Sequence, residues 1–527
     1  MSDLPSDPAA KGQAKRSDAD SEDVTATHLD EPAAGGDDST TGGNEPTAGG
    51  DEHRNMKRHV IRGILLVGVA SVFMRGGGLI AQVFAGRLLS SEDFGLFAIT
   101  LGFTTLSVAS LSALRPLFIE RLTAGQDVEG LWRLMLVVMI GLSAAMAALA
   151  QPLALALGQP GARNVLLAMA PTLPLQFAQV IGIARLAAGL RFSESSKILT
   201  IAALVRHGSL IVFALAGFGV YSLVLPLYVE AVTQGALLWR ASGRPPALRG
   251  EIAGVFRQYG SSLRWLLLSA VALAASLNGD YLAISPFETA QLVGYYFFGY
   301  QLSAALTQPF TMAATNVLVP SFATVKDRSK LQSSYLDAIS VLLLITGMAF
   351  GGLALVGGPL IDAVWSGKWN DSIIAMVLIS AGTPFRILQP TCYSLVQSLG
   401  RWDSYARLVT FNATFAVGGA VIGALLGGLF EIALMVGLAG FFVGVVVAVI
   451  AGRHIGIAAG TTMLRLLRGA LPPTVGLGFA FGLFPELLST PADTMLRVAV
   501  FAVASLPLTF LLFRSSLTEI VASVRRT

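Results

Sequence analysis

The sequence predicts an all-α integral membrane protein with about fourteen transmembrane helices. Three observations lead to this fold class. Hydrophobic residues make up 54% of the 527 positions and Asp, Glu, Lys and Arg only 13%, so most of the chain cannot form a water-facing surface. Apolar runs of about 20 residues recur from Gly63 onward, and this length crosses about 30 Å of hydrocarbon as an α-helix. Basic residues gather in alternate loops between these runs.

The same composition argues against other classes of protein. The single cysteine, Cys392, lies in an apolar run, which excludes an intrachain disulfide framework and a Cys-based zinc or iron–sulfur site. The net charge of +4 resides largely in short loops, so it indicates membrane topology rather than nucleic-acid binding. We expect no cofactor, no metal and no catalytic residues.

Residues 1–55 are rich in Asp, Glu, Gly, Ser, Thr and Pro and lack aliphatic periodicity, so we expect a disordered acidic tail in the cytoplasm. They lack the apolar stretch of a signal peptide, which makes the first membrane segment the expected insertion signal. The sequence MKRHVIRG at Met56 already gives that segment a basic flank. We therefore expect residues 1–55 to be dispensable for insertion.

The apolar runs predict the spans in chain order, with boundaries good to a few residues. Their approximate cores are residues 63–86, 94–117, 134–157, 164–186, 198–217, 219–239, 265–284, 293–316, 338–363, 373–397, 408–428, 430–451, 470–488 and 495–513.

Loop charge predicts the orientation, because positively charged short loops stay in the cytoplasm. One set of alternate loops carries most of the Lys and Arg residues, whereas the other holds little beyond Arg87, Arg163 and Lys368. Both termini are therefore expected in the cytoplasm, with the chain in the cell inner membrane. The tryptophans lie at or near predicted span ends, where an amphipathic ring is favoured; they are Trp132, Trp239, Trp265, Trp365, Trp369 and Trp402.

A repeat divides the chain into two halves. GRLLSSEDFGLFAITLGF (86–103) follows the first span and AISPFETAQLVGYYFFGYQL (283–302) follows the seventh. Each has a polar turn with an acidic residue and then a Gly-aromatic start to the next helix. We expect two six-helix bundles in a parallel pseudo-repeat plus two C-terminal helices, an arrangement of transporters with a site between their halves. The expected divisions are a first lobe over 56–240, a basic cytoplasmic linker over 241–262, a second lobe over 263–453, two additional transmembrane helices over 454–513 and a cytoplasmic tail over 514–527.

Three arginines lie near the middle of predicted spans: Arg75 in the first, Arg206 in the fifth and Arg386 in the tenth. An arginine at a helix centre costs about 2.5 to 3.5 kcal/mol on translocon scales, so all three are expected to face a polar interior. Glu230 in the sixth span and Asp280 near the outer end of the seventh can neutralise two of them at most. The remaining positive charge suits an anionic substrate. Alternatively, each arginine holds helices together through carbonyl or carboxylate partners.

His207 follows Arg206 and points about 100° away from it around the helix, since a helix has about 3.6 residues per turn. A polar packing role fits this position better than a proton relay. Together with the two acidic residues, His207 completes the set of candidate coupling or charge-pairing residues: Glu230, Asp280 and His207.

Four segments carry a family resemblance: GRLLSSEDFGLFAI (86–99), NGDYLAI with LVGYY (278–296), VPSFATVKDRSKL (319–331), and SGKWNDSI followed by PFRILQPTCYSLVQSLGRWD (366–403). They resemble the Wzx-type polysaccharide flippases, the polysaccharide transporter family of the MOP superfamily, which also includes MATE exporters and lipid II flippases. The last segment is similar to the colanic acid and succinoglycan exporter subgroup, where a GxKW turn, a mid-helix arginine and a GR-acid turn follow in this order. The resemblance extends from Met56 to Arg514.

The resemblance implies the MOP flippase fold, with two six-helix lobes around a central cavity. It also implies movement of undecaprenyl-diphosphate-linked oligosaccharide to the periplasmic leaflet for exopolysaccharide, capsule or lipopolysaccharide biosynthesis, beside a polysaccharide polymerase and co-polymerase. Arg386 matches the family's arginine in the tenth helix, whereas Arg75 stands where that subgroup has a small or apolar residue. The acidic tail is a second departure. Because a diphosphate offers several oxygens to guanidinium groups, we expect Arg75, Arg206 and Arg386 to line one central cavity and bind it.

Other functions stay open from sequence alone. A MATE-like exporter of cationic drugs would favour an acidic cavity, whereas the expected one is basic. A membrane glycosyltransferase, polymerase or ligase normally needs carboxylates and histidines at a large lumenal loop, and the predicted lumenal loops have about ten residues or fewer. A non-transporting scaffold gives no reason to bury three arginines. The sequence has no GxxxxGK[ST] loop, so transport is expected to depend on an ion gradient, product withdrawal or another protein.

Overall fold

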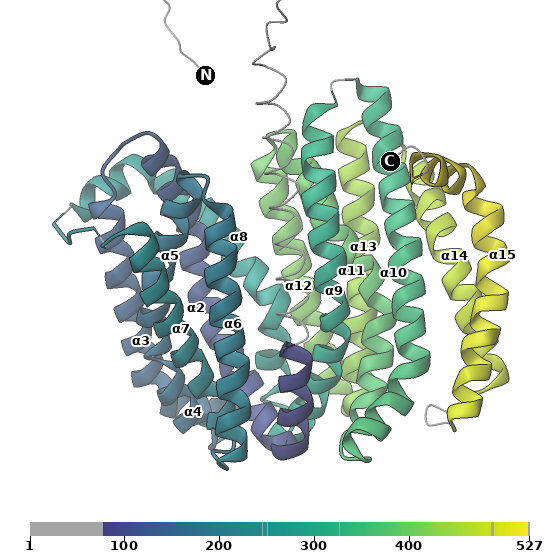
Figure 1. The fold of residues 1–527 in the computed structure, drawn as a ribbon, viewed down its shortest axis with the longest axis horizontal. Coiled ribbons are helices and arrows are strands. Elements are labelled where there is room, and N and C mark those ends of the chain that lie inside the picture. Colours follow the sequence, from purple (N-terminus) through teal and green to yellow (C-terminus); the bar gives the residue numbers. More distant parts are fainter. Residues whose placement is uncertain (1–76, 245, 250, 326, 486–489, 525–527) are drawn as a thin grey trace, which may run out of the picture. The chain divides into compact units, whose positions relative to one another are not determined.

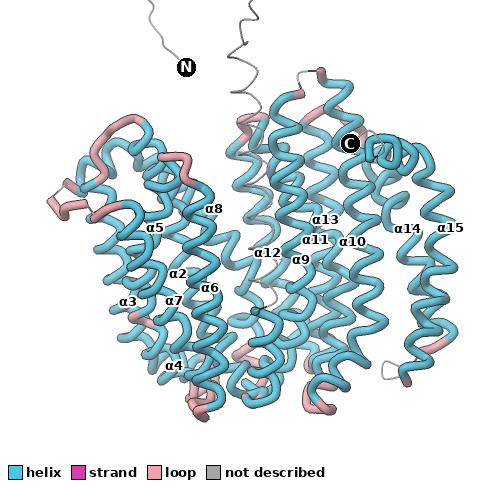
Figure 2. Tube along the Cα trace, viewed as in Figure 1, coloured by secondary structure: helices cyan, strands magenta, loops and turns pink. Residues whose placement is uncertain are grey.

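The structure, a computed structural model, describes residues 77–244, 246–249, 251–325, 327–485 and 490–524. In these residues the chain forms α-helices joined by turns, without a β-strand (Figure 2). An α-helix satisfies its backbone hydrogen bonds internally, which is what a segment in lipid requires. The predicted all-α fold class is confirmed. Residues 1–55 and Arg75 lie outside the described residues.

The described chain begins with helical residues 77–88 and continues through the helices labelled in Figure 1. Those of the first half are α2 (Ser91–Thr123), α3 (Glu129–Ala156), α4 (Ala162–Met169), α5 (Thr172–Ala188), α6 (Phe192–Leu215) and α7 (Tyr221–Ser242). Those that follow are α8 (Ile252–Ile284), α9 (Ala290–Thr324), α10 (Arg328–Trp365), α11 (Ser372–Ser398), α12 (Trp402–Leu426), α13 (Leu429–His454), α14 (Ala459–Leu483) and α15 (Pro491–Val524).

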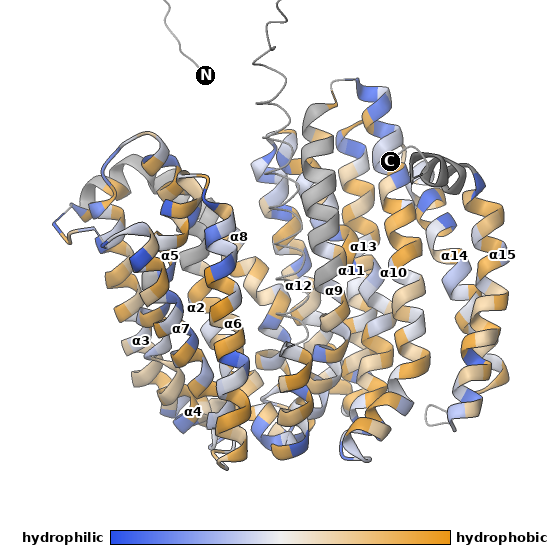
Figure 3. Ribbon diagram, viewed as in Figure 1, coloured by the Kyte–Doolittle hydropathy of each residue, from blue (hydrophilic) through white to orange (hydrophobic). Residues whose placement is uncertain are grey.

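Eleven helices in the described part of the chain are long and apolar enough to cross a membrane. Figure 3 shows hydrophobic residues along most of α10 and α15 and hydrophilic residues at many of the turns. The protein is therefore a multi-pass membrane protein. The first predicted span lies mostly outside the described residues, and the long helices α2 and α9 are not among the eleven. The number fourteen thus stays a prediction.

Two helix boundaries differ from the predicted spans for identifiable reasons. The expected fourth span, 164–186, lies within one candidate span, Ala162–Ala188, but its helix is interrupted between α4 and α5, with Pro171 immediately before α5. Proline lacks a backbone N–H and cannot continue the hydrogen-bond ladder from α4. In addition, α8 begins at Ile252, well before the predicted span start at residue 265. The second part of the expected linker, 241–262, is thus continuous with a membrane helix.

The two copies of the sequence repeat pack against each other where α2 and α9 begin. A Cβ atom on Gly95 would lie 1.7 Å from the Ala290 carbonyl oxygen, and one on Gly294 would lie 1.8 Å from the Ser91 carbonyl oxygen. The two contacts are reciprocal, because each glycine faces the residue four positions before the other. Small residues at a helix crossing allow backbones to approach this closely.

The turns before these two helices also correspond. Ser90 caps α2, where its hydroxyl accepts from the Asp93 N–H and the Asp93 carboxylate accepts from the Ser90 N–H. Thr289 caps α9 by accepting from the Leu292 N–H at 3.3 Å. Such side-chain caps satisfy backbone donors that have no partner within the helix. The shared polar turn of the repeat is therefore a shared helix start.

The GKW turn of the sequence, between α10 and α11, is fastened to the end of the helix over 77–88. We call this contact the clasp; it comprises five hydrogen bonds between residues 83–89 and 364–369. Its donors are two indoles, one ammonium and one guanidinium, and every acceptor is a backbone carbonyl. The bonds are Trp369 Nε1 to Gly86 O (2.8 Å), Trp365 Nε1 to Val83 O (3.2 Å), Lys368 Nζ to Leu89 O (2.6 Å) and Arg87 O (3.0 Å), and Arg87 Nε to Val364 O (3.0 Å).

Candidate functional site

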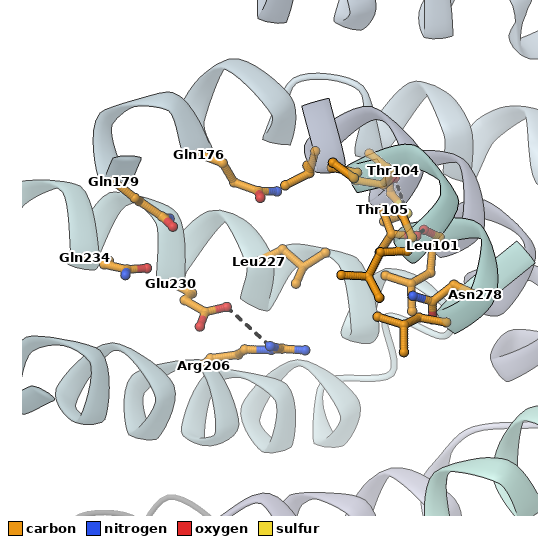
Figure 4. Close-up of a pocket in the computed structure, with 17 residues that line it drawn as sticks. Leu101, Thr104, Thr105, Gln176, Gln179, Arg206, Leu227, Glu230, Gln234 and Asn278 are labelled. Atoms are coloured by element: carbon orange, nitrogen blue, oxygen red, sulfur yellow. Dashed lines mark hydrogen bonds and ion pairs between the residues drawn. The ribbon is translucent and has the colours of Figure 1, made fainter. Parts of the chain in front are cut away.

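A polar cavity of about 470 Å³ lies among α2, α5, α6, α7 and α8 (Figure 4). This volume is within the range of about 300 to 1,000 Å³ that is typical of ligand pockets. We call it the amide cavity, since four amide side chains face it. Its polar lining residues are Thr104, Thr105, Gln176, Gln179, Arg206, Glu230, Gln234 and Asn278.

Arg206 and Glu230 form an ion pair in the amide cavity. Arg206 Nη1 lies 3.4 Å from Glu230 Oε2, and the two side chains are 40% and 25% exposed. The pair joins α6 to α7, which pack along each other. A carboxylate next to an intramembrane guanidinium lowers the cost of keeping both charges in the membrane. The expectation that Glu230 can neutralise an arginine therefore fits the geometry.

His207 faces another direction. A Cβ atom on Gly78 would lie 3.4 Å from both Cε1 and Nε2 of the His207 ring, so the imidazole packs beside the helix over 77–88. His207 is not among the residues that line the amide cavity. This position agrees with a polar packing role.

Arg386 lies in α11 beside a cluster of tyrosines. Its Nη2 atom donates to the Tyr300 hydroxyl at 2.8 Å, and its guanidinium carbon is 5.3 Å from the centre of the Tyr300 ring. The aliphatic part of the side chain packs on Gly440, where a Cβ atom would be 2.8 Å from Arg386 Cγ and Cδ. The cation is thus held by an aromatic ring and a hydroxyl rather than by a carboxylate.

Asp280 is 7% exposed and lies near Arg386. One carboxylate oxygen accepts from the Tyr296 hydroxyl at 2.7 Å, and the other accepts from the Tyr281 backbone N–H at 3.1 Å. Asp280 and Arg386 line one very small cavity together with Ser276 and Asn412. No ion pair within 4.0 Å joins Asp280 to Arg386 among the described residues.

The structure thus places Arg206 with Glu230 and Arg386 near Asp280, in two separate cavities. Both cavities border α8, because Asn278 lines the first and Asp280 the second. The third expected site residue, Arg75, lies outside the described residues. In the described ranges there is no group of three or more His, Cys, Asp or Glu side chains that could hold a metal ion.

Sequence reasoning missed the amides and the tyrosines of these cavities. Gln176 and Gln179 lie within a predicted span, as does Gln234, and each such amide is costly in lipid unless it has a partner. The cost of an unpartnered amide in lipid could therefore have identified these three glutamines as candidate cavity residues from the sequence. Tyr296 and Tyr300 belong to the run GYYFFGY, where aromatic residues are equally typical of ordinary packing.

These membrane-spanning helices, with polar cavities between them, form a multi-spanning helical fold. Several solved structures share it. The lipid II flippase MurJ in an inward closed conformation has a TM-score of 0.69 at 15% identity, covering 86% of this chain and 100% of that chain. An inward-facing multidrug resistance MATE family transporter of the MOP superfamily has a TM-score of 0.54 at 15% identity, covering 72% and 94%. These likenesses establish the MOP fold.

The chain belongs to the family described as "Polysaccharide biosynthesis protein", whose profile matches residues 84–374. It is similar to the succinoglycan biosynthesis transport protein ExoT of Rhizobium meliloti, with 22% identity over 66% of this chain and 70% of the relative. It is also similar to the lipopolysaccharide biosynthesis protein WzxC of Escherichia coli, with 22% identity over 72% and 78%. The teichuronic acid biosynthesis protein TuaB of Bacillus subtilis is 23% identical over 43% and 49%. The resemblance seen in the sequence is confirmed.

Proposed function

We propose that this protein is a flippase that moves undecaprenyl-diphosphate-linked oligosaccharide repeat units across the bacterial inner membrane. The units would supply exopolysaccharide, capsule or lipopolysaccharide biosynthesis, and a polymerase and co-polymerase would take them up. The observation that carries this proposal is a polar cavity with a guanidinium group inside the membrane helices of a polysaccharide biosynthesis family member. The protein would carry out no covalent chemistry.

The transport step would be alternating access. In this scheme the first lobe, 56–240, and the second lobe, 263–453, rock against each other, and the helices at 454–513 accompany the second. Arg75, Arg206 and Arg386 would contact the lipid-linked ligand. Glu230, Asp280 and His207 would pair with these charges or couple transport to an ion. The reciprocal contact of α2 with α9 supports a pivot between corresponding parts of the two lobes.

Loss and restoration of the lipid-linked intermediate test this function. In a strain that lacks the gene, undecaprenyl-diphosphate-linked repeat units should accumulate in the inner membrane and polysaccharide export should stop. Expression of the full chain should reverse both effects. Unchanged export in the deletion strain, together with a new sensitivity to cationic drugs, would instead favour a MATE-like exporter.

Membrane topology gives an independent prediction. Lys330 and Lys368 lie at opposite ends of α10, which spans Arg328–Trp365. A reporter that works only in the periplasm should be active when fused after Lys368 and inactive after Lys330 or Thr527, because basic loops stay in the cytoplasm. The reverse pattern would overturn the proposed orientation. Activity at Thr527 together with Lys368 would mean an odd number of spans.

A further inference from the structure

The four amide side chains of the amide cavity have no hydrogen-bond partner in the part of the protein that the structure describes. Gln176, Gln179, Gln234 and Asn278 form no hydrogen bond with any other described residue, although all of them line the cavity. Gln234 is only 5% exposed. Buried amides normally find partners, because an unsatisfied polar group in an apolar surrounding is costly. Gln176, Gln179 and Asn278 are partly exposed in the cavity, where water or a ligand can meet their amides, and Gln234 is the buried amide that most needs such a partner.

Helix geometry arranges three of these amides, together with Glu230, in one pair on α5 and one pair on α7. Gln176 and Gln179 are three residues apart on α5, and Glu230 and Gln234 are four residues apart on α7, so each pair lies on one helix face. Figure 4 shows both pairs directed into the same space, with Arg206 at its edge. A ligand between them can meet polar groups from both sides.

The charges of the described lining residues balance each other. Among the described residues that line it, Arg206 is the one cation and Glu230 the one anion, and the two are paired at 3.4 Å. A diphosphate would meet the Glu230 carboxylate as well as the guanidinium, so its own charge would not be compensated. Arg206 is therefore poorly suited to hold a diphosphate in this cavity.

Sugar hydroxyl groups fit this lining better. Each hydroxyl both donates and accepts, an amide offers one acceptor and two donors, and the charged pair adds one group of each kind. Apolar side chains of three helices that line the same cavity, Leu101 of α2, Leu227 of α7 and Leu277 of α8, can cover the C–H faces of a sugar ring. The lining thus matches a neutral, hydroxyl-rich ligand.

We propose that the amide cavity binds the glycan part of the transported lipid, and that the diphosphate binds elsewhere in the protein. This inference rests on the proposed function and refines it, because it assigns Arg206 to the sugar rather than to the diphosphate. Gln179 and Gln234 are specificity-determining residues in this assignment, together with the Arg206–Glu230 pair.

Two ligands with the same lipid anchor test the proposal. The full-length protein in nanodiscs is titrated with undecaprenyl diphosphate and with the lipid-linked oligosaccharide extracted from the source bacterium. The Gln179→Met, Gln234→Met variant keeps side-chain volume but removes both amides. It should bind the oligosaccharide lipid about tenfold more weakly, because a net hydrogen bond changes affinity severalfold and two are lost. Its affinity for undecaprenyl diphosphate should stay within about twofold of the unmodified protein.

The controls separate the possible failures. Gln151→Met, an exposed position on α3, should change neither affinity, and retained binding of undecaprenyl diphosphate shows that a variant is folded. The single Gln179→Met and Gln234→Met variants provide milder changes if the double variant is unstable. Equal losses for both ligands, or no loss for the oligosaccharide lipid, would overturn the glycan assignment alone. An unmodified protein that binds neither ligand would contradict the proposed function itself.

Discussion

Gly95→Ala and Gly294→Ala are each expected to lower membrane abundance and stability and to reduce export strongly. The added methyl carbon would lie 1.7 or 1.8 Å from a backbone carbonyl oxygen of the opposite helix. Backbone cannot move aside as a flexible side chain can, so α2 and α9 must separate. Overpacking of this kind costs about 1 to 3 kcal/mol and sometimes more. Thermal unfolding of the purified protein and export from intact cells measure the two effects.

Gly418→Ala is the matched control for these variants. Gly418 lies inside α12, and a Cβ atom there would have no other atom within 4 Å. Alanine is favoured over glycine in a helix by about 1 kcal/mol, so this variant should be as stable as the unmodified protein or more so. If Gly95→Ala and Gly294→Ala behave like Gly418→Ala, the close crossing of α2 and α9 is not required for folding.

Arg386→Ala is expected to abolish or greatly reduce export while membrane abundance stays near normal. Removal of an intramembrane charge also removes its desolvation cost, and nearby Asp280 keeps its hydrogen bonds from Tyr296 and the Tyr281 N–H. Arg386→Lys should restore export only in part, because lysine keeps the charge but loses the planar fork of donors. Tyr300→Phe should have a smaller effect, since it removes a single hydrogen bond to Arg386.

Membrane level and export are measured together for each arginine variant. Arg133→Ala, at an exposed position on α3, is the control for loss of a positive charge and should export normally. A fall in abundance that precedes the fall in export would mean that Arg386 is structural. Full export from a variant with alanine at Arg75, Arg206 and Arg386 would show that none of these cations is needed for transport.

Apolar run length alone predicted much of the fold. The predicted cores 338–363 and 373–397 lie within α10 and α11, because a run of this length has few alternatives to a membrane helix. The start of α8 at Ile252 could not be found in this way. That part of the helix contains Arg257 and Gln258 and lacks the hydropathy of a span. Its helical state depends on continuity with the apolar part of α8.

The candidate site was predicted less completely. Mid-span charges are visible because they are costly in lipid, and the sequence predicts that Glu230 can neutralise an arginine without identifying Arg206 as its partner. The contact of Arg386 with Tyr300 could not, because it joins helices 86 positions apart and tyrosine is common in apolar runs. Arg206 and Arg386 line separate cavities because of the way α8 packs between the neighbouring helices. No local sequence pattern predicts this packing.

If the proposed alternating access opens the clasp, the hydrogen bonds of the clasp also set an energy scale for that step. Four of the five acceptors are carbonyl groups of residues 83–89, towards the end of the helix over 77–88, and the fifth is Val364 O of α10. Water can replace the protein donors when the contact opens. Five hydrogen bonds with net values of about 0.5 to 1.5 kcal/mol each amount to roughly 3 to 7 kcal/mol. A shift between two conformations from 1:99 to 99:1 needs about 5.5 kcal/mol. A contact of this strength would keep the resting protein almost entirely in one state, yet a single bound ligand could still reverse the preference.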